Sequence, residues 1–183
     1  FMDVALSAFY YVQDFSVDLL ATDGETMYFN GQMLGGEYRQ NRIEVNRAYL
    51  HLVLHCIFRH VFRRNGREEL VWNLAADIAV ESVIDDWNLQ NIRKSQSWIR
   101  QRTYRDLKEE IKVFTAEKIY GVLVRWKLSD REMERMVREF TVDDHKRNEP
   151  EVAGYQRENA DRYGNFFERS SIKYRAFSGS GPG

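Results

Sequence analysis

The sequence has little proline and cysteine and contains no long apolar run. Only two prolines occur in 183 residues, so few positions interrupt a helix. The single cysteine, Cys56, cannot form a disulfide within the chain, which favours a reducing compartment. No apolar stretch approaches the roughly 20 residues that a membrane-spanning helix needs. Hydrophobic residues nevertheless make up 43% of the chain, which excludes a disordered protein and predicts a mainly helical domain with a real core.

Charge of neither sign dominates the sequence. Lysine and arginine together number 27 against 28 aspartates and glutamates, which gives a formal net charge of -1. A balanced chain has no overall field that recruits nucleic acid or an acidic membrane, so we expect neither partner. The first residues also lack the basic start and apolar run of a secretion signal. We therefore expect a cytoplasmic protein whose partners are selected by a local site.

The first 40 residues predict a helix followed by a β-hairpin. Apolar residues at mixed helical spacing indicate an opening helix over residues 2–20. Asp23-Gly24 then marks a tight turn between two short apolar segments of residues 21–30, and Asn30-Gly31 marks a second turn. Gly35-Gly36 and a polar stretch follow. This hairpin is the best β-hairpin in the chain, and the predicted fold class is mainly α (α+β).

Two long helices are expected to follow as neighbours. Asn46 can cap the first, which carries the histidines and ends at Asn65-Gly66 after a basic run. The second covers residues 70–87 and alternates apolar with acidic positions at helical spacing. The short break between them makes the two helices antiparallel neighbours. A polar stretch over residues 88–105 comes next.

Two further helices complete the predicted domain. Thr115 can cap one of them, and Ser129 and Glu132 form a capping box that opens the other. The helical pattern weakens from residue 149 onward. We therefore predict a domain over residues 1–150 and a C-terminal extension or linker over residues 151–183, partly flexible because of its Gly/Ser tail.

Three of the four histidines lie within ten residues, at positions 51, 55 and 60. His51 and His55 are four residues apart, so on a helix they point only about 40° apart and can bind one metal ion. Zinc peptidases use this spacing and place a glutamate beside the first histidine as the general base. Leu52 occupies that position in this chain.

The next helix is the expected source of a third metal ligand. Zinc commonly takes a carboxylate from outside the two-histidine turn, and Asp77 is well placed, with Glu81 on the same face. His60 lies about 140° further round a regular helix than His55, so it ranks behind Asp77 unless the helix distorts. His145, which follows two aspartates, is the other weaker metal candidate.

Each of these residues also has a purely structural explanation. Histidines on an apolar helix are often buried hydrogen-bonding residues, and Asp77 can be a buried acceptor beside Asn73. Glu81, Asp85 and Asp86 fit a solvated helix face, which is the interpretation that we favour for Glu81. The clustering of three histidines within ten residues favours a metal site over this alternative.

Four motifs occur in an order that resembles a known family. Ala-Thr-Asp-Gly at residues 21–24 precedes the histidine helix at residues 49–60. Trp-Asn-Leu-Ala-Ala-Asp follows at residues 72–77, and Asp-Asp-His stands at residues 143–145. Over about residues 1–150, this combination resembles the metallopeptidase-type domain of bacterial von Willebrand factor A-like (VWA-like) proteins. The resemblance implies a zincin-like helical domain in which a small hairpin or sheet flanks the histidine helix.

The resemblance also indicates what the domain binds. The expected cofactor is zinc or another divalent ion, held by His51, His55 and Asp77. The resemblance implies a MoxR-type AAA+ ATPase as a partner. In zincins a strand beside the metal pairs with an extended peptide, so a peptide or protein segment is the expected ligand of residues 21–30. The substrate-binding residues predicted there are Thr22, Asp23, Gly24 and Tyr28.

Catalysis is expected to be impaired. Family members often carry glutamate where this chain has Leu52, and removal of a general base typically costs ~10²–10⁴ in rate. Glu81 and Asp144 are weak candidates for a replacement base. Two alternatives stay open. One is an active zinc metallopeptidase that uses another carboxylate. The other is a metal-free helical interaction module in which the histidines and acids form a buried polar network.

Overall fold

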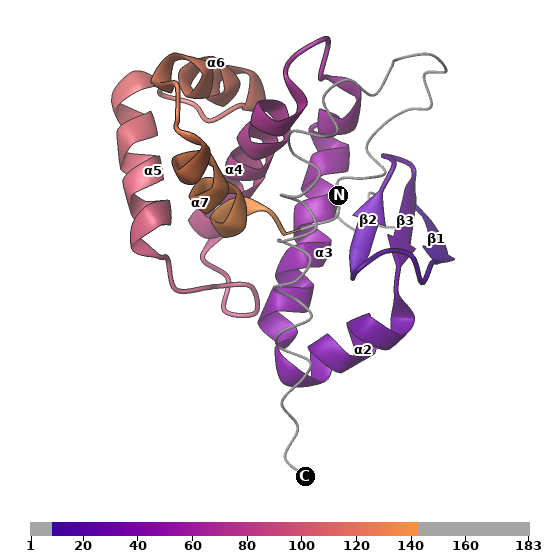
Figure 1. Ribbon diagram of the computed structural model, residues 1–183. Coiled ribbons are helices and arrows are strands. Elements are labelled where there is room, and N and C mark those ends of the chain that lie inside the picture. Colours follow the sequence, from indigo (N-terminus) through magenta and orange to yellow (C-terminus); the bar gives the residue numbers. More distant parts are fainter. Residues whose placement is uncertain (1–8, 143–183) are drawn as a thin grey trace. The chain divides into compact units, whose positions relative to one another are not determined.

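The computed structural model describes residues 9–142, which are mainly helical with one small sheet, as predicted (Figure 1). The elements in this part are β1 (Tyr10–Gln13), β2 (Leu20–Thr22), β3 (Thr26–Phe29), α2 (Gly31–Gln40), α3 (Arg42–Ile57), the 3-10 turn η1 (His60–Phe62), α4 (Glu69–Trp87), α5 (Trp98–Glu110), α6 (Ala116–Trp126) and α7 (Asp130–Phe140). None of these helices is long and apolar enough to cross a membrane. The predicted C-terminal extension, residues 151–183, lies outside the described residues.

The predicted hairpin is present and belongs to a three-stranded sheet. β2 and β3 pair antiparallel on either side of the turn at Gly24, whose φ of 99° is readily adopted by glycine. β1 adds to the other edge of β3 in parallel, which gives the order β1-β3-β2. The helix predicted over residues 2–20 is therefore wrong for residues 10–20. Tyr10 to Gln13 instead pair with the backbone of β3. The spacing of their apolar residues carries no signal of this pairing.

Asn30 begins a helix rather than a turn. Its side chain accepts a hydrogen bond from the Met33 N–H at 3.3 Å and donates to the Val17 carbonyl at 3.2 Å. The Asn30-Gly31 turn is thus a wrong prediction, because the asparagine satisfies the first turn of α2 as an N-cap. Gly35 lies inside α2, where an added Cβ would meet no atom within 4 Å.

The histidine helix starts and ends earlier than predicted. Asn41 caps α3, and the predicted cap, Asn46, lies inside the helix and donates to the Asn91 carbonyl at 3.2 Å. α3 ends at Ile57, because Arg59 adopts a left-handed conformation with φ of 57°. The predicted end at residues 65–66 is instead a second left-handed turn before α4. Because α3 ends early, His60 lies in η1 rather than on α3. The offset from His55 that we expected on one continuous helix therefore does not apply.

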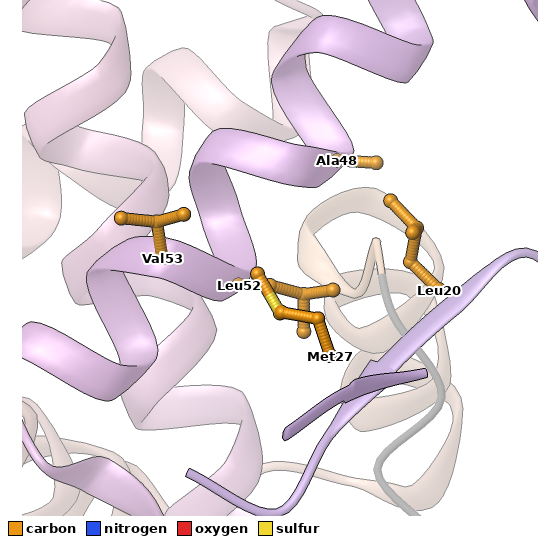
Figure 2. Close-up of a cluster of buried hydrophobic side chains, with 5 residues drawn as sticks. All are labelled: Leu20, Met27, Ala48, Leu52 and Val53. Carbon is orange, nitrogen blue, oxygen red and sulfur yellow. The ribbon is translucent and has the colours of Figure 1, made fainter. Parts of the chain in front are cut away.

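α3 lies between the sheet and α4 and contacts both (Figure 1). Towards the sheet, one buried cluster joins the helix to β2 and β3, and Figure 2 shows its members Leu20, Met27, Ala48, Leu52 and Val53. Towards α4, a second cluster joins Leu50, Leu54, Val80, Ile84 and Ile92. One helix therefore has an apolar side on the sheet and another on α4.

The last three helices pack beyond α4. α4 contacts α6 and α7, and α5 contacts α7. Thr115 and the Ser129–Glu132 capping box begin α6 and α7 as predicted. No helix was predicted within the polar stretch of residues 88–105, but α5 begins at Trp98 with Ser97 as its cap. α5 brings Arg100 against α4, which matters for the site.

Candidate metal centre

Polar side chains at four-residue spacing form two facing rows on α3 and α4. Because four residues turn a helix by about 400°, each row stays on one helix face. The row on α3 is Arg47, His51 and His55, and the row on α4 is Asp77, Glu81 and Asp85. All but Asp85 are at most 1% exposed, and the Asp85 side chain is only 5% exposed. The solvated face predicted for Glu81 and Asp85 is therefore wrong, whereas Asp86 is exposed as expected.

The two histidines and Asp77 place three donor atoms close together. His51 Nε2 lies 2.8 Å from His55 Nε2. Asp77 Oδ1 lies 3.6 Å from His51 Nε2 and 3.3 Å from His55 Nε2. Zinc bonds of about 2.0–2.1 Å at tetrahedral angles put neighbouring ligand atoms roughly 3.3 Å apart. The three atoms therefore form a triangle of the size that a divalent ion requires, and these residues fit a metal.

Each of the three donor residues makes a further contact through an atom that is not part of the triangle. The second ring nitrogen of His51, Nδ1, lies 2.9 Å from Glu81 Oε1. The second ring nitrogen of His55 lies 3.3 Å from His60 Nδ1. Asp77 Oδ2 accepts a hydrogen bond from the Thr141 hydroxyl at 2.8 Å. Metal-binding residues are typically oriented by such outer contacts, so this feature strengthens the fit.

The Glu81 carboxylate is held by two buried arginines. Its Oε2 accepts hydrogen bonds from Arg47 Nε at 2.9 Å, Arg47 Nη2 at 2.6 Å and Arg100 Nη1 at 2.6 Å. Burial alone would raise the pKa of the Glu81 carboxyl, but the hydrogen bond and charge of His51 and the charges of the two arginines lower that pKa to about 2. Glu81 is therefore ionised at neutral pH.

Asp85 binds the same two arginines one turn further along α4. Its oxygens accept hydrogen bonds from Arg47 Nη2 at 2.5 Å, Arg100 Nη1 at 3.0 Å and the Tyr104 hydroxyl at 2.9 Å. Arg100 also binds the Glu139 carboxylate at 2.9 Å. Side chains from α3, α4, α5 and α7 thus meet in one charged network behind His51.

His60 stands behind the metal triangle rather than in it. It is buried, and its carbonyl accepts a hydrogen bond from Trp72 Nε1 at 3.3 Å. Burial, followed by the charge of His55, lowers the pKa of His60 to about 3. A neutral imidazole keeps one nitrogen as an acceptor, so His60 Nδ1 can accept a hydrogen bond from an Nδ1–H group of His55. His60 reaches this place because α3 ends before it.

Leu52, at the position of the missing glutamate, faces the sheet. Its side chain is fully buried in the apolar cluster with Met27 and Leu20 (Figure 2). Cys56 is half-buried, with its sulfur 3.5 Å from the Thr22 hydroxyl. The Leu52 side chain has no group that could act as a general base.

The four predicted substrate-binding residues make contacts within the hairpin. The Thr22 hydroxyl donates to the Thr26 carbonyl at 2.8 Å, and Asp23 accepts a hydrogen bond from the Tyr28 hydroxyl at 2.8 Å. An added Cβ on Gly24 would lie 2.7 Å from the Phe62 ring, so the turn packs closely against η1. Thr22 is buried with β2, whereas the other three are partly exposed. Their role in binding a peptide stays a prediction.

Several important residues of this site were not predicted. Arg47, Arg100 and Thr141 were missed, and Asp85 was considered only as a surface residue. A signal existed for Arg47, because it lies four residues before His51 on the same helix face and no other Lys, Arg, Asp or Glu follows it before residue 59. His145 and Asp144, the remaining candidates, lie outside the described residues.

The fold and the site together define a helical domain with a buried His-His-Asp group suited to a divalent metal. A family model described as "Putative metallopeptidase domain" matches residues 1–178, and the chain belongs to this family. No curated protein and no solved structure matches the chain. The family therefore agrees with the donor set that α3 and α4 bring together.

Proposed function

We propose that this chain is a zinc-binding, zincin-like domain that has lost most or all peptidase activity and serves as a peptide-binding or scaffold module. The observation that carries the proposal is the triangle of His51 Nε2, His55 Nε2 and Asp77 Oδ1, in which every donor residue is oriented by a further contact. Two imidazoles and a carboxylate are typical ligands of zinc. Magnesium and calcium instead prefer oxygen ligands alone.

Loss of activity follows from what surrounds the donor residues. A bound zinc ion would supply Lewis acidity and lower the pKa of a bound water. The chain must then provide a base, and Leu52 has none. Glu81 is a poor substitute, because its two oxygens already face two arginines and His51. We therefore infer that Glu81 has a positioning role, while Asp144 stays a prediction.

Metal content is the decisive test. The protein should be purified without a histidine tag and its zinc measured by elemental analysis. We expect about one zinc per chain, and loss of zinc in His51→Ala, His55→Ala and Asp77→Ala. The matched control is Asp86→Ala, which removes an exposed carboxylate from the same helix and should keep the zinc. A parent protein that binds no zinc at micromolar concentration would overturn the proposal.

Peptidase assays test the second half of the proposal. The zinc-loaded parent should hydrolyse a casein-derived peptide mixture no faster than His51→Ala does. Hydrolysis that depends on His51 would instead favour the active metallopeptidase. That enzyme would then need a base other than Leu52, and Glu81→Gln would show whether Glu81 supplies it.

Peptide binding is proposed at the hairpin turn, because β2 itself is buried while Asp23, Gly24 and Tyr28 are partly exposed. Hydrogen exchange at the turn amides should slow when an unfolded protein such as reduced casein is added. Binding without protection of the turn would place the peptide elsewhere. A VWA-like context and a MoxR-type ATPase partner rest on the sequence resemblance alone, and co-purification with such an ATPase tests them.

A metal-free interaction module is the second candidate. It is favoured by the 2.8 Å contact between the two Nε2 atoms, which is also the length of a direct hydrogen bond between neutral imidazoles. In that case one continuous polar chain would run from Arg47 through Glu81, His51 and His55 to His60 without an ion. Absence of zinc, with unchanged folding of the parent protein in a chelator, is the result that would select this candidate.

A further inference from the structure

The Glu81 carboxylate divides its two oxygens between two kinds of partner. Oε2 faces only cationic donors, which are Arg47 at 2.6 Å and 2.9 Å and Arg100 at 2.6 Å. Oε1 lies 2.9 Å from His51 Nδ1. The guanidinium groups cannot act as acceptors, so they fix which side of Glu81 must accept hydrogen bonds.

This arrangement dictates where His51 carries its proton. An ionised carboxylate only accepts, so the hydrogen in the 2.9 Å contact must belong to Nδ1 of His51. In a neutral imidazole the other nitrogen then has a lone pair. That nitrogen, Nε2, is the atom that faces His55 and Asp77.

We propose that Glu81, held by Arg47 and Arg100, is a positioning residue that sets the tautomer of His51 so that Nε2 presents its lone pair to the ligand. This inference rests on the proposed function for the nature of the ligand, a divalent metal ion. The tautomer itself belongs to the metal-free chain and can be measured there.

Glu81→Gln tests the idea sharply because the arginines remove the usual ambiguity of an amide. Arg47 and Arg100 only donate, so the glutamine oxygen must face them, and its NH₂ group must face His51 Nδ1. A donor at that position requires Nδ1 to accept. The proton of His51 then moves to Nε2, where it blocks binding to a metal.

Asp85→Asn is a matched control. Asp85 accepts hydrogen bonds from the same two arginines and lies one turn further along α4. Its substitution removes one negative charge from the same network, while the His51–Glu81 contact stays in place. A general weakening of the fold should therefore affect both variants, whereas a change of tautomer should affect only Glu81→Gln.

The first readout is long-range ¹H–¹⁵N NMR of the histidine rings in the full metal-free chain near neutral pH. We expect the Nδ1–H tautomer for His51 in the parent and in Asp85→Asn, and the Nε2–H tautomer in Glu81→Gln. An Nε2–H tautomer in the parent would overturn the inference without any variant, so it remains testable if Glu81→Gln fails to fold. A folded Glu81→Gln that keeps the Nδ1–H tautomer would also overturn it.

The second readout is zinc affinity by chelator competition. Loss of an outer contact to a metal-binding histidine typically weakens binding by about 10- to 100-fold, which is the loss expected for Glu81→Gln. Asp85→Asn should stay within about threefold of the parent. Equal zinc affinity in Glu81→Gln and the parent would refute the positioning role and leave the proposed function intact. A parent that binds no zinc would refute the proposed function, while the NMR result would still decide the tautomer.

Discussion

Replacement of Leu52 by glutamate would give residues 51–55 the His-Glu-x-x-His pattern of zinc peptidases. We expect this change to destabilise the protein rather than to create a peptidase. Leu52 is fully buried against Met27 and Leu20 between α3 and the sheet. A carboxyl group at this position would have no charged or hydrogen-bonding partner in the apolar cluster. Burial in such surroundings raises the pKa of a glutamic acid to about 8–9.

The magnitude follows from two contributions. Loss of the buried leucine side chain costs roughly 1.5–3 kcal/mol. Keeping the carboxyl protonated at pH 7, against an unfolded pKa of about 4.3, costs roughly 3.7 kcal/mol more. The sum, about 5–7 kcal/mol, is comparable with the whole stability of an ordinary domain, about 5–15 kcal/mol.

The sign of the pH dependence provides the assay. A carboxyl whose folded pKa is raised favours folding least at high pH, so Leu52→Glu should lose stability as the pH rises from about 4 to about 8. Urea unfolding at pH 5 and pH 8 measures this loss, with Leu52→Gln as the uncharged control of similar shape. The stability gap between the two variants should widen by about 4 kcal/mol between these pH values.

A stability gap that changes by less than about 0.5 kcal/mol between the two pH values would refute the reasoning, because it would mean that position 52 reaches water. In that case a glutamate there could also reach the metal site, and the variant should be assayed for peptidase activity. The control variant removes the pH dependence of the parent from the comparison.

Gly24→Ala tests the packing of the hairpin turn, with Gly35→Ala as its control, and Thr141→Val tests the outer contact of Asp77. Gly24→Ala should cost roughly 1–3 kcal/mol in urea unfolding, because its φ of 99° is strained for alanine and the new Cβ would lie 2.7 Å from the Phe62 ring. Gly35→Ala is the matched control and should stabilise by about 0.5–1 kcal/mol, since its Cβ meets no atom within 4 Å inside a helix. Similar effects of the two changes would contradict this account. Thr141→Val removes the 2.8 Å hydrogen bond to Asp77 and should weaken zinc binding about tenfold, and unchanged affinity would show that Asp77 is oriented without it.

The fold was predictable where a signal acts over a few neighbouring residues. The Asp23-Gly24 turn and the Ser129–Glu132 capping box each fix a conformation within four residues, and both predictions are confirmed. β1 was missed because it depends on parallel pairing with a strand 16 residues away, which leaves no local period. α5 was missed because of its high polarity, although Ser97 caps it and the buried positions 100, 103, 104 and 107 have helical spacing.

The grouping of His51, His55 and Asp77 was predictable from spacing, whereas the charged network behind it was not. His51 and His55 lie four residues apart on one helix, and Asp77 is on the next helix, so sequence distance sufficed. Charged residues, by contrast, are usually assigned to the surface because burial of an unpaired charge is costly. Arg100 is an exception to that rule. It lies on α5 and reaches Glu81 of α4 only through tertiary packing, and nothing in the local sequence predicts this pairing.

The charge balance of the network bears on the choice between a metal site and a metal-free module. The cluster contains two guanidinium groups and four carboxylates, so with all carboxylates ionised and neutral histidines it lacks two positive charges. Its charged members are Arg47, Arg100, Asp77, Glu81, Asp85 and Glu139, of which only Glu139 is more than slightly exposed. Unbalanced charge is expensive in a buried site. One divalent cation between His51, His55 and Asp77 would supply two positive charges, which a metal-free module must obtain by binding protons instead. This balance favours the metal, and it would allow two arginines to be buried close to a bound cation.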